Sequence, residues 1–177
     1  VMRTSLWPGL AMAVLHNQSR QQSRVRLFEA GLRFTPTADG LEQVPMLAGI
    51  VSGDAFQASW NNPKNSLDFF DVKGNIESLL TLCGVVGEFV ATTQTVLHPG
   101  QAAEITVQGA VIGCVGALHP SVIEALGLSG PVYVFELQQS ALLQGRLPQF
   151  KPLSRFPAVS RDLALLVPDR VAAAEIL

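Results

Sequence analysis

A periodic pattern of apolar residues near the start of the chain predicts a helix over residues 5–22. Spacings of three and four place these side chains on one face of an amphipathic helix. The residues on that face are Leu6, Leu10, Ala13, Val14 and Asn17. Thr4 or Ser5 can cap its start, and Pro8 is tolerated in the first turn, where a missing N–H costs nothing.

A second helix is predicted over residues 68–83. Its apolar stripe consists of Val72, Ile76, Leu79, Leu80 and Cys83. Asp68 or Asp71 can cap the N-terminus, and Gly84 suits the position just past the end. A shorter helix should open at Pro120 and close at Gly127, and a helical turn is expected at residues 140–143.

Alternating apolar and polar residues predict strands between these helices. Residues 25–34 and 43–53 form a long hairpin around the turn-rich residues 35–40, and residues 59–66 form a polar loop. Further strands are expected near 87–93, 103–108, 110–118 and 132–137. Taken alone, these strands and helices indicate a mixed domain of helices and strands.

The last thirty residues follow a different pattern. Pro148, Pro152 and Pro157 interrupt residues 146–157, which we interpret as a linker. A strand at 162–167 and the start of a helix at 171–177 follow, as at the front of a separate small domain. Because the chain begins inside a motif and stops inside a helical pattern, we expect it to be a piece of a longer protein.

Composition narrows the class of protein. Apolar residues make up 48% of the 177 residues and charged residues only 15%, which is a globular balance with few surface charges. A net charge of −2 and a pI of 5.9 argue against dominant nonspecific nucleic-acid binding. Cys83 and Cys114 lack metal-site spacing and are interpreted as small core residues. With neither a membrane-length apolar run nor a signal peptide, a cytoplasmic location without membrane contact is expected.

Residues that could carry chemistry are scattered. His98 and His119 each precede a proline and are interpreted as turn residues, and Ser5 with His16 gives no triad pattern. Residues 113–116 (GCVG) lack the remaining features of a nucleotide loop, so these glycines are expected to allow close packing.

Charged clusters also have ordinary explanations. Asp68, Asp71 and Glu77 could be drawn as a magnesium site, but helix capping explains the two aspartates better. The densest basic stretch consists of Arg20, Arg24, Arg26 and Arg33. We interpret it as a solvated helix end, with contact to a protein partner or to phosphate groups as the alternative. We therefore assign no catalytic, cofactor-binding or metal-binding residue.

Five collinear motifs resemble one family. They are residues 2–10 with 26–31 (MRTSLWPGL, RLFEAG), 68–74 (DFFDVKG), 97–103 (LHPGQAA), 116–120 (GALHP) and 155–162 (RFPAVSRD). In this order they resemble the C-terminal part of the beta subunit of bacterial phenylalanyl-tRNA synthetases. The resemblance implies an α+β fold: a class II synthetase core-like domain over residues 1–147, with a mostly antiparallel sheet flanked by helices. It also implies that residues 148–177 are a linker plus the first strand and helix of a truncated ferredoxin-like anticodon-binding domain.

The resemblance also implies a role. In this family the beta-subunit core does no aminoacylation but packs on the catalytic alpha subunit in a two-alpha, two-beta assembly. The whole enzyme uses ATP and Mg²⁺ to attach phenylalanine to tRNA(Phe). A working class II site needs two arginines for phosphates. Here Arg26 and Glu29 have an altered spacing, and neither residues 113–119 nor the helix after Pro120 contain an arginine. A non-catalytic scaffold is therefore expected. The alternatives are a free-standing synthetase-like paralogue that binds a small molecule or tRNA, and a residual adenylating enzyme.

Overall fold

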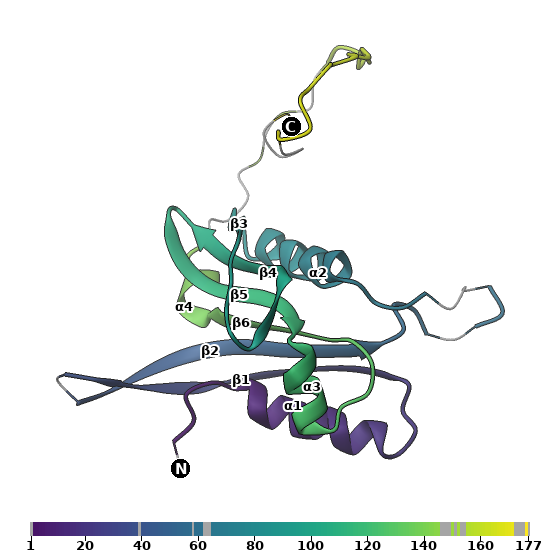
Figure 1. The fold of residues 1–177 in the computed structure, drawn as a ribbon. Coiled ribbons are helices and arrows are strands. Elements are labelled where there is room, and N and C mark those ends of the chain that lie inside the picture. The colour runs from purple at the N-terminus through teal and green to yellow at the C-terminus, as the bar shows by residue number, and fades with distance from the viewer. Residues whose placement is uncertain are drawn as a thin grey trace.

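A six-stranded sheet forms the centre of the computed structural model, which describes residues 2–38, 40–57, 59–61, 65–145, 150, 152, 155–171 and 176 (Figure 1). The strands are β1 (Arg24–Thr37), β2 (Gly40–Gly53), β3 (Glu88–Ala91), β4 (Leu97–Val107), β5 (Ala110–Leu118) and β6 (Val132–Gln138). They lie in the order β1-β2-β6-β5-β4-β3, and every neighbouring pair is antiparallel. The predicted α+β class with an antiparallel sheet is confirmed.

Strands β1 and β2 form the predicted hairpin, but the predicted turn over residues 35–40 is too long. The pairing runs without interruption from Arg24 opposite Gly53 to Thr37 opposite Gly40. Pro36 is accommodated because β1 is the edge strand of the sheet, where a missing N–H breaks no ladder. Gly40 has a φ of 129°, a conformation that favours glycine, so the tight end of the hairpin depends on this residue.

Helices cover both faces of the sheet, and each face has its own core. Helices α1 (Trp7–Gln18) and α3 (Pro120–Leu126) pack on one face, and α2 (Phe69–Leu82) and α4 (Gln139–Leu142) on the other (Figure 1). On the α1 face the core includes Leu6, Val14, Met46, Ile50 and Val134. On the α2 face it includes Val72, Ile76, Ile105, Val115 and Leu137. The alternation of Val134 and Leu137 between faces follows from the two-residue period of a strand.

The helix ends differ in how well the sequence predicted them. For α2 the prediction is confirmed: the Asp71 amide donates to Asp68 Oδ1, and the Asp68 amide donates to Asp71 Oδ2, both at 2.9 Å. The predicted first helix is too long, because α1 ends at Gln18. Arg20 therefore lies beyond the helix, and the other three arginines of the basic stretch lie on β1 rather than at a helix end.

Residues 155–171 contain no helix and no strand, so the predicted strand over 162–167 is wrong. A strand needs a partner for its backbone hydrogen bonds, and no described strand pairs with this segment. Leu163 and Leu166 are exposed to solvent. The predicted linker and terminal helix lie largely outside the described residues, because residues 146–149, 151, 153, 154, 172–175 and 177 are not among them. The boundary near residue 147 stays a prediction.

Candidate functional site

Arg26, which lies where the phosphate-binding arginine motif was sought, points to the α2 face of β1. Its neighbours Val25 and Leu27 pack on the α1 face, and strand alternation places Arg26 opposite them. Its Nη2 donates a hydrogen bond to the Ala55 carbonyl at 3.1 Å. Burial lowers the pKa of the Arg26 guanidinium; Arg24 lowers it further, and Asp71 opposes the shift. The side chain is thus tied to the protein backbone.

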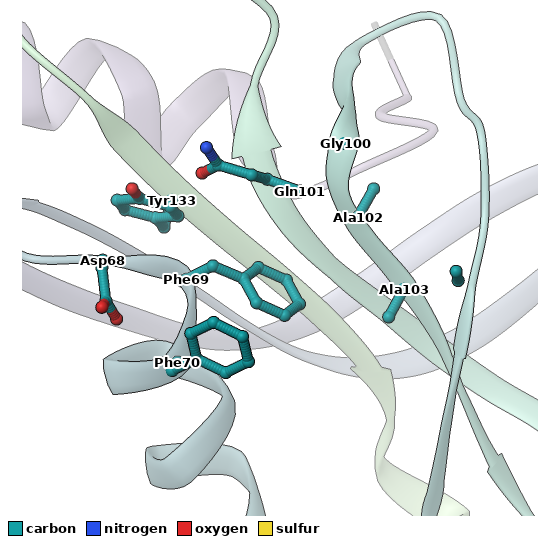
Figure 2. Close-up of a pocket in the computed structure, with 9 residues that line it drawn as sticks. Asp68, Phe69, Phe70, Gly100, Gln101, Ala102, Ala103 and Tyr133 are labelled. Carbon is teal, nitrogen blue, oxygen red and sulfur yellow. The ribbon is translucent and has the colours of Figure 1, made fainter. Parts of the chain in front are cut away.

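A pocket of about 410 Å³ lies on the same face, beside the N-terminus of α2 (Figure 2). It is lined by Asp68, Phe69, Phe70, Ala91, Gly100, Gln101, Ala102, Ala103 and Tyr133. Tyr133 comes from the central strand β6, whereas Asp68 and the two phenylalanines come from the start of α2 (Figure 2). Burial raises the pKa of the Tyr133 hydroxyl, and the carboxylates of Asp68 and Asp71 raise it further. The pocket is therefore aromatic, with a carboxylate at its edge.

This arrangement is unsuited to a polyphosphate. Phosphate groups are bound by guanidinium or ammonium groups aimed at a common point. Among the described residues of the lining, Asp68 is the only one with a charged side chain, and its charge has the wrong sign. The next arginine after Arg33 in the sequence is Arg146, so β2 to β6 and helices α2 to α4 contain none. The described residues thus place no pair of arginines around this pocket.

The hydrogen bonds of His98 and His119 serve local structure. The Nδ1 atom of His98 accepts a hydrogen bond from the Gly100 amide at 3.1 Å. The Nδ1 atom of His119 accepts one from the Ser121 amide at 3.2 Å and so caps α3. His16 lies on α1 beside Arg20. The interpretation of His98 and His119 as turn residues agrees with these contacts.

The other candidates also have structural partners. Glu77 pairs with Lys73 one turn earlier on α2, while Asp68 and Asp71 cap the helix. Within the described residues, no group of three or more histidine, cysteine, aspartate or glutamate side chains could hold a metal ion. Cys83 and Cys114 are both free thiols.

Glu136 is a residue that sequence reasoning missed. It lies on β6, facing α1, and only 6% of it is exposed. Its Oε1 accepts hydrogen bonds from the Leu6 amide at 2.8 Å and the Ser5 hydroxyl at 3.2 Å. Its Oε2 lies 3.7 Å from Arg33 Nη1. The available signal was a lone acidic residue in the apolar strand 132–137, on the same face as Val132 and Val134.

The family follows from a comparison of the whole sheet domain. A family model described as the phenylalanyl tRNA synthetase beta chain CLM domain matches residues 1–139. The chain belongs to this family. The match contains all six strands and helices α1 to α3, so both faces described above are parts of the beta chain domain.

Three beta-subunit relatives align with nearly the whole of this chain. The phenylalanine–tRNA ligase beta subunit of Pseudomonas fluorescens is 51% identical over 100% of this chain, and that of Hahella chejuensis is 45% identical over 99%. The subunit from Colwellia psychrerythraea is 46% identical over 100%. The chain spans only 22–23% of the length of these relatives. In the described part of this beta chain domain, no helix has the length and apolar character needed to span a bilayer.

Proposed function

We propose that this chain is a non-catalytic core of the phenylalanine–tRNA ligase beta subunit, with a class II synthetase-like sheet. In this proposal it scaffolds the catalytic alpha subunit while the whole enzyme uses ATP and Mg²⁺ to charge tRNA(Phe) in the cytoplasm. Two alpha and two beta subunits form the assembly. Residues 148–177 begin a ferredoxin-like domain that contacts tRNA.

The observation that carries the non-catalytic role is the distribution of arginines. The three arginines of the sheet all lie on β1. Arg26 is bonded to a carbonyl on the α2 face, and Arg33 faces Glu136 on the α1 face. Arg26 and Arg33 therefore cannot converge on one triphosphate. Arg24 shares the face of Arg26 by strand alternation, but neither of the two lines the pocket of Figure 2. This supports a core that retains the architecture of the family without adenylation chemistry.

A titration tests the absence of nucleotide binding. We expect no saturable heat when ATP and MgCl₂ are added to the chain at micromolar concentration, with or without phenylalanine. The whole alpha–beta enzyme, titrated in the same way, is the positive control. Stoichiometric micromolar binding of ATP by the chain alone would overturn the non-catalytic role and favour the residual adenylating enzyme.

Coexpression with the alpha subunit tests the scaffold. Exposed apolar side chains on α1 and α2, such as Met12 (59% exposed) and Leu82 (86%), are candidates for the contact. We expect copurification of the alpha subunit to be lost in Met12→Glu or Leu82→Glu, with an unchanged circular dichroism spectrum. Leu163→Glu, which alters an exposed leucine outside every helix and strand, is the matched control.

The outcomes of this experiment separate the remaining alternatives. Failure of the unaltered chain to copurify with an alpha subunit would favour a free-standing binding module. Copurification that survives both helix substitutions would place the contact on another surface and leave the scaffold role intact.

A further inference from the structure

A second cavity, of about 520 Å³, lies on the α1 face of the sheet, opposite the pocket of Figure 2. Its walls are mostly apolar: Trp7 comes from α1, Val122 from α3 and Val134 from β6. Cavities of a few hundred cubic ångströms with a few convergent polar groups are typical sites for small molecules. The helices that enclose it stand on the same side of the sheet in Figure 1.

The charged groups among the described lining residues are a buried carboxylate and an arginine with unused donors, and Ser5, Gln94 and Cys114 are the other polar side chains. Glu136 is nearly fully buried, and the Leu6 amide and Ser5 hydroxyl already bond its Oε1. The Arg33 guanidinium lies 3.7 Å from Glu136 Oε2, beyond hydrogen-bond distance. Its Nε atom is buried without a hydrogen-bond partner among the described residues. An unsatisfied buried donor is destabilising, so an acceptor is what this site lacks.

The chemistry of the missing partner follows from these groups. The Ser5 hydroxyl and the Leu6 amide, just before α1, offset part of the Glu136 charge, so Arg33 can bridge Glu136 and a second anion. Because a guanidinium binds a carboxylate through two parallel N–H bonds, a carboxylate satisfies more of its donors than an alcohol does. An ammonium group would instead be repelled by Arg33. The apolar walls favour a hydrocarbon or aromatic body.

We propose that the cavity between α1, α3 and the sheet binds a small apolar monocarboxylate, whose carboxylate pairs with Arg33 and whose body contacts Trp7. This site is separate from the proposed scaffold role and does not depend on it. Glu136 fixes the residues that precede α1 through its hydrogen bonds to Ser5 and Leu6, so the ligand enters a preformed site.

Tryptophan fluorescence provides a direct test. The chain contains two tryptophans: Trp7, in the cavity wall, and Trp60, which is 97% exposed. In a Trp60→Phe background, Trp7 is the sole reporter. We expect phenylacetate to change its emission saturably, and phenethylamine to bind at least tenfold more weakly. Arg33→Gln should weaken phenylacetate binding at least tenfold, and Arg33→Lys should restore part of it.

Controls separate binding from folding. Arg24→Gln removes another β1 arginine, which does not line this cavity. This variant should bind phenylacetate with the same affinity as the unaltered chain. Val122→Phe should block binding by filling the cavity while the thermal melt stays cooperative. The proposal is overturned if phenylacetate gives no saturable change at millimolar concentration. It is also overturned if the amine binds equally well, or if folded Arg33→Gln and Arg33→Lys both bind like the unaltered chain.

Discussion

Replacing Gly113 by alanine should destabilise the sheet strongly. Gly113 lies on β5 opposite Leu137 of β6. An ideal Cβ added there would lie 2.0 Å from the Glu136 carbonyl oxygen and 2.9 Å from Leu137 Cα. Both obstacles are backbone atoms of a central strand, so no side-chain rotation relieves the overlap. The strands must separate, which weakens their hydrogen bonds. Since overpacking alone costs about 1–3 kcal/mol, we expect a loss of about 3 kcal/mol or more in the free energy of unfolding.

Gly74→Ala is the matched control and should change the free energy of unfolding in the opposite direction. Gly74 lies inside α2, and a Cβ there would have no heavy atom within 4 Å beyond its chain neighbours and the adjacent helix backbone. Alanine should stabilise the helix by about 0.5–1 kcal/mol, because glycine loses more backbone entropy in a helix. Urea unfolding followed by far-ultraviolet circular dichroism measures both. A Gly113→Ala chain that unfolds at the same urea concentration as the unaltered chain would refute the close approach of β5 and β6.

Three further predictions concern the cap of α2, a buried thiol and the C-terminal segment. Asp68→Ala should lower the free energy of unfolding by about 1–2 kcal/mol, and Asp68→Asn by less, because asparagine also caps; urea unfolding measures both, and equal losses would contradict the cap. Burial raises the pKa of the Cys114 thiol from 9.0 to about 11, so at pH 8 iodoacetamide should label it about a hundredfold more slowly in the folded chain than in urea, by mass spectrometry. Equal rates would contradict its burial. Trypsin should cut at exposed Arg155 or Arg161 before any site in the sheet, as gel electrophoresis will show. Protection of both sites in a dilute monomer would contradict the boundary near residue 147.

The sequence predicted best those helix ends that are fixed by residues close to them in the chain. Helix α2 was predicted to within a residue at each end because Asp68 and Asp71 satisfy its first amides and Gly84 follows its end. The start of α1 was predicted two residues too early, because Leu6 rather than Thr4 or Ser5 is its N-cap. Its end was missed because the residue with positive φ that follows it is Gln21, not a glycine that would mark a stop. The strand predicted at 162–167 has the right composition, but composition cannot supply the neighbouring strand that pairing requires.

Features that depend on strand register could not be predicted. The approach of Arg33 to Glu136 requires β1 to pair with β2 and β2 with β6, so that residues distant in sequence share one face. Neither residue belongs to a motif. A close contact at Gly113 was predicted, because the glycines of residues 113–116 were expected to allow close packing. The strand that makes the contact, β6, was identified only by the sheet order.

The unequal lengths of the strands divide the hairpin into two parts with different stability. Strand β6 pairs with β2 only from Met46 to Ser52, so the far half of the hairpin is a two-stranded ribbon. Such ribbons are marginal alone. Here the Phe34 amide donates to the Arg3 carbonyl at 2.9 Å, and Arg3 Nε donates to the Leu32 carbonyl at 3.1 Å. Amide protons of the ribbon should therefore exchange with solvent by local opening, at rates set by Arg3, while those of β5 and β6 exchange only when the sheet unfolds. Insertions at the hairpin tip should then alter this opening without changing the melting of the sheet.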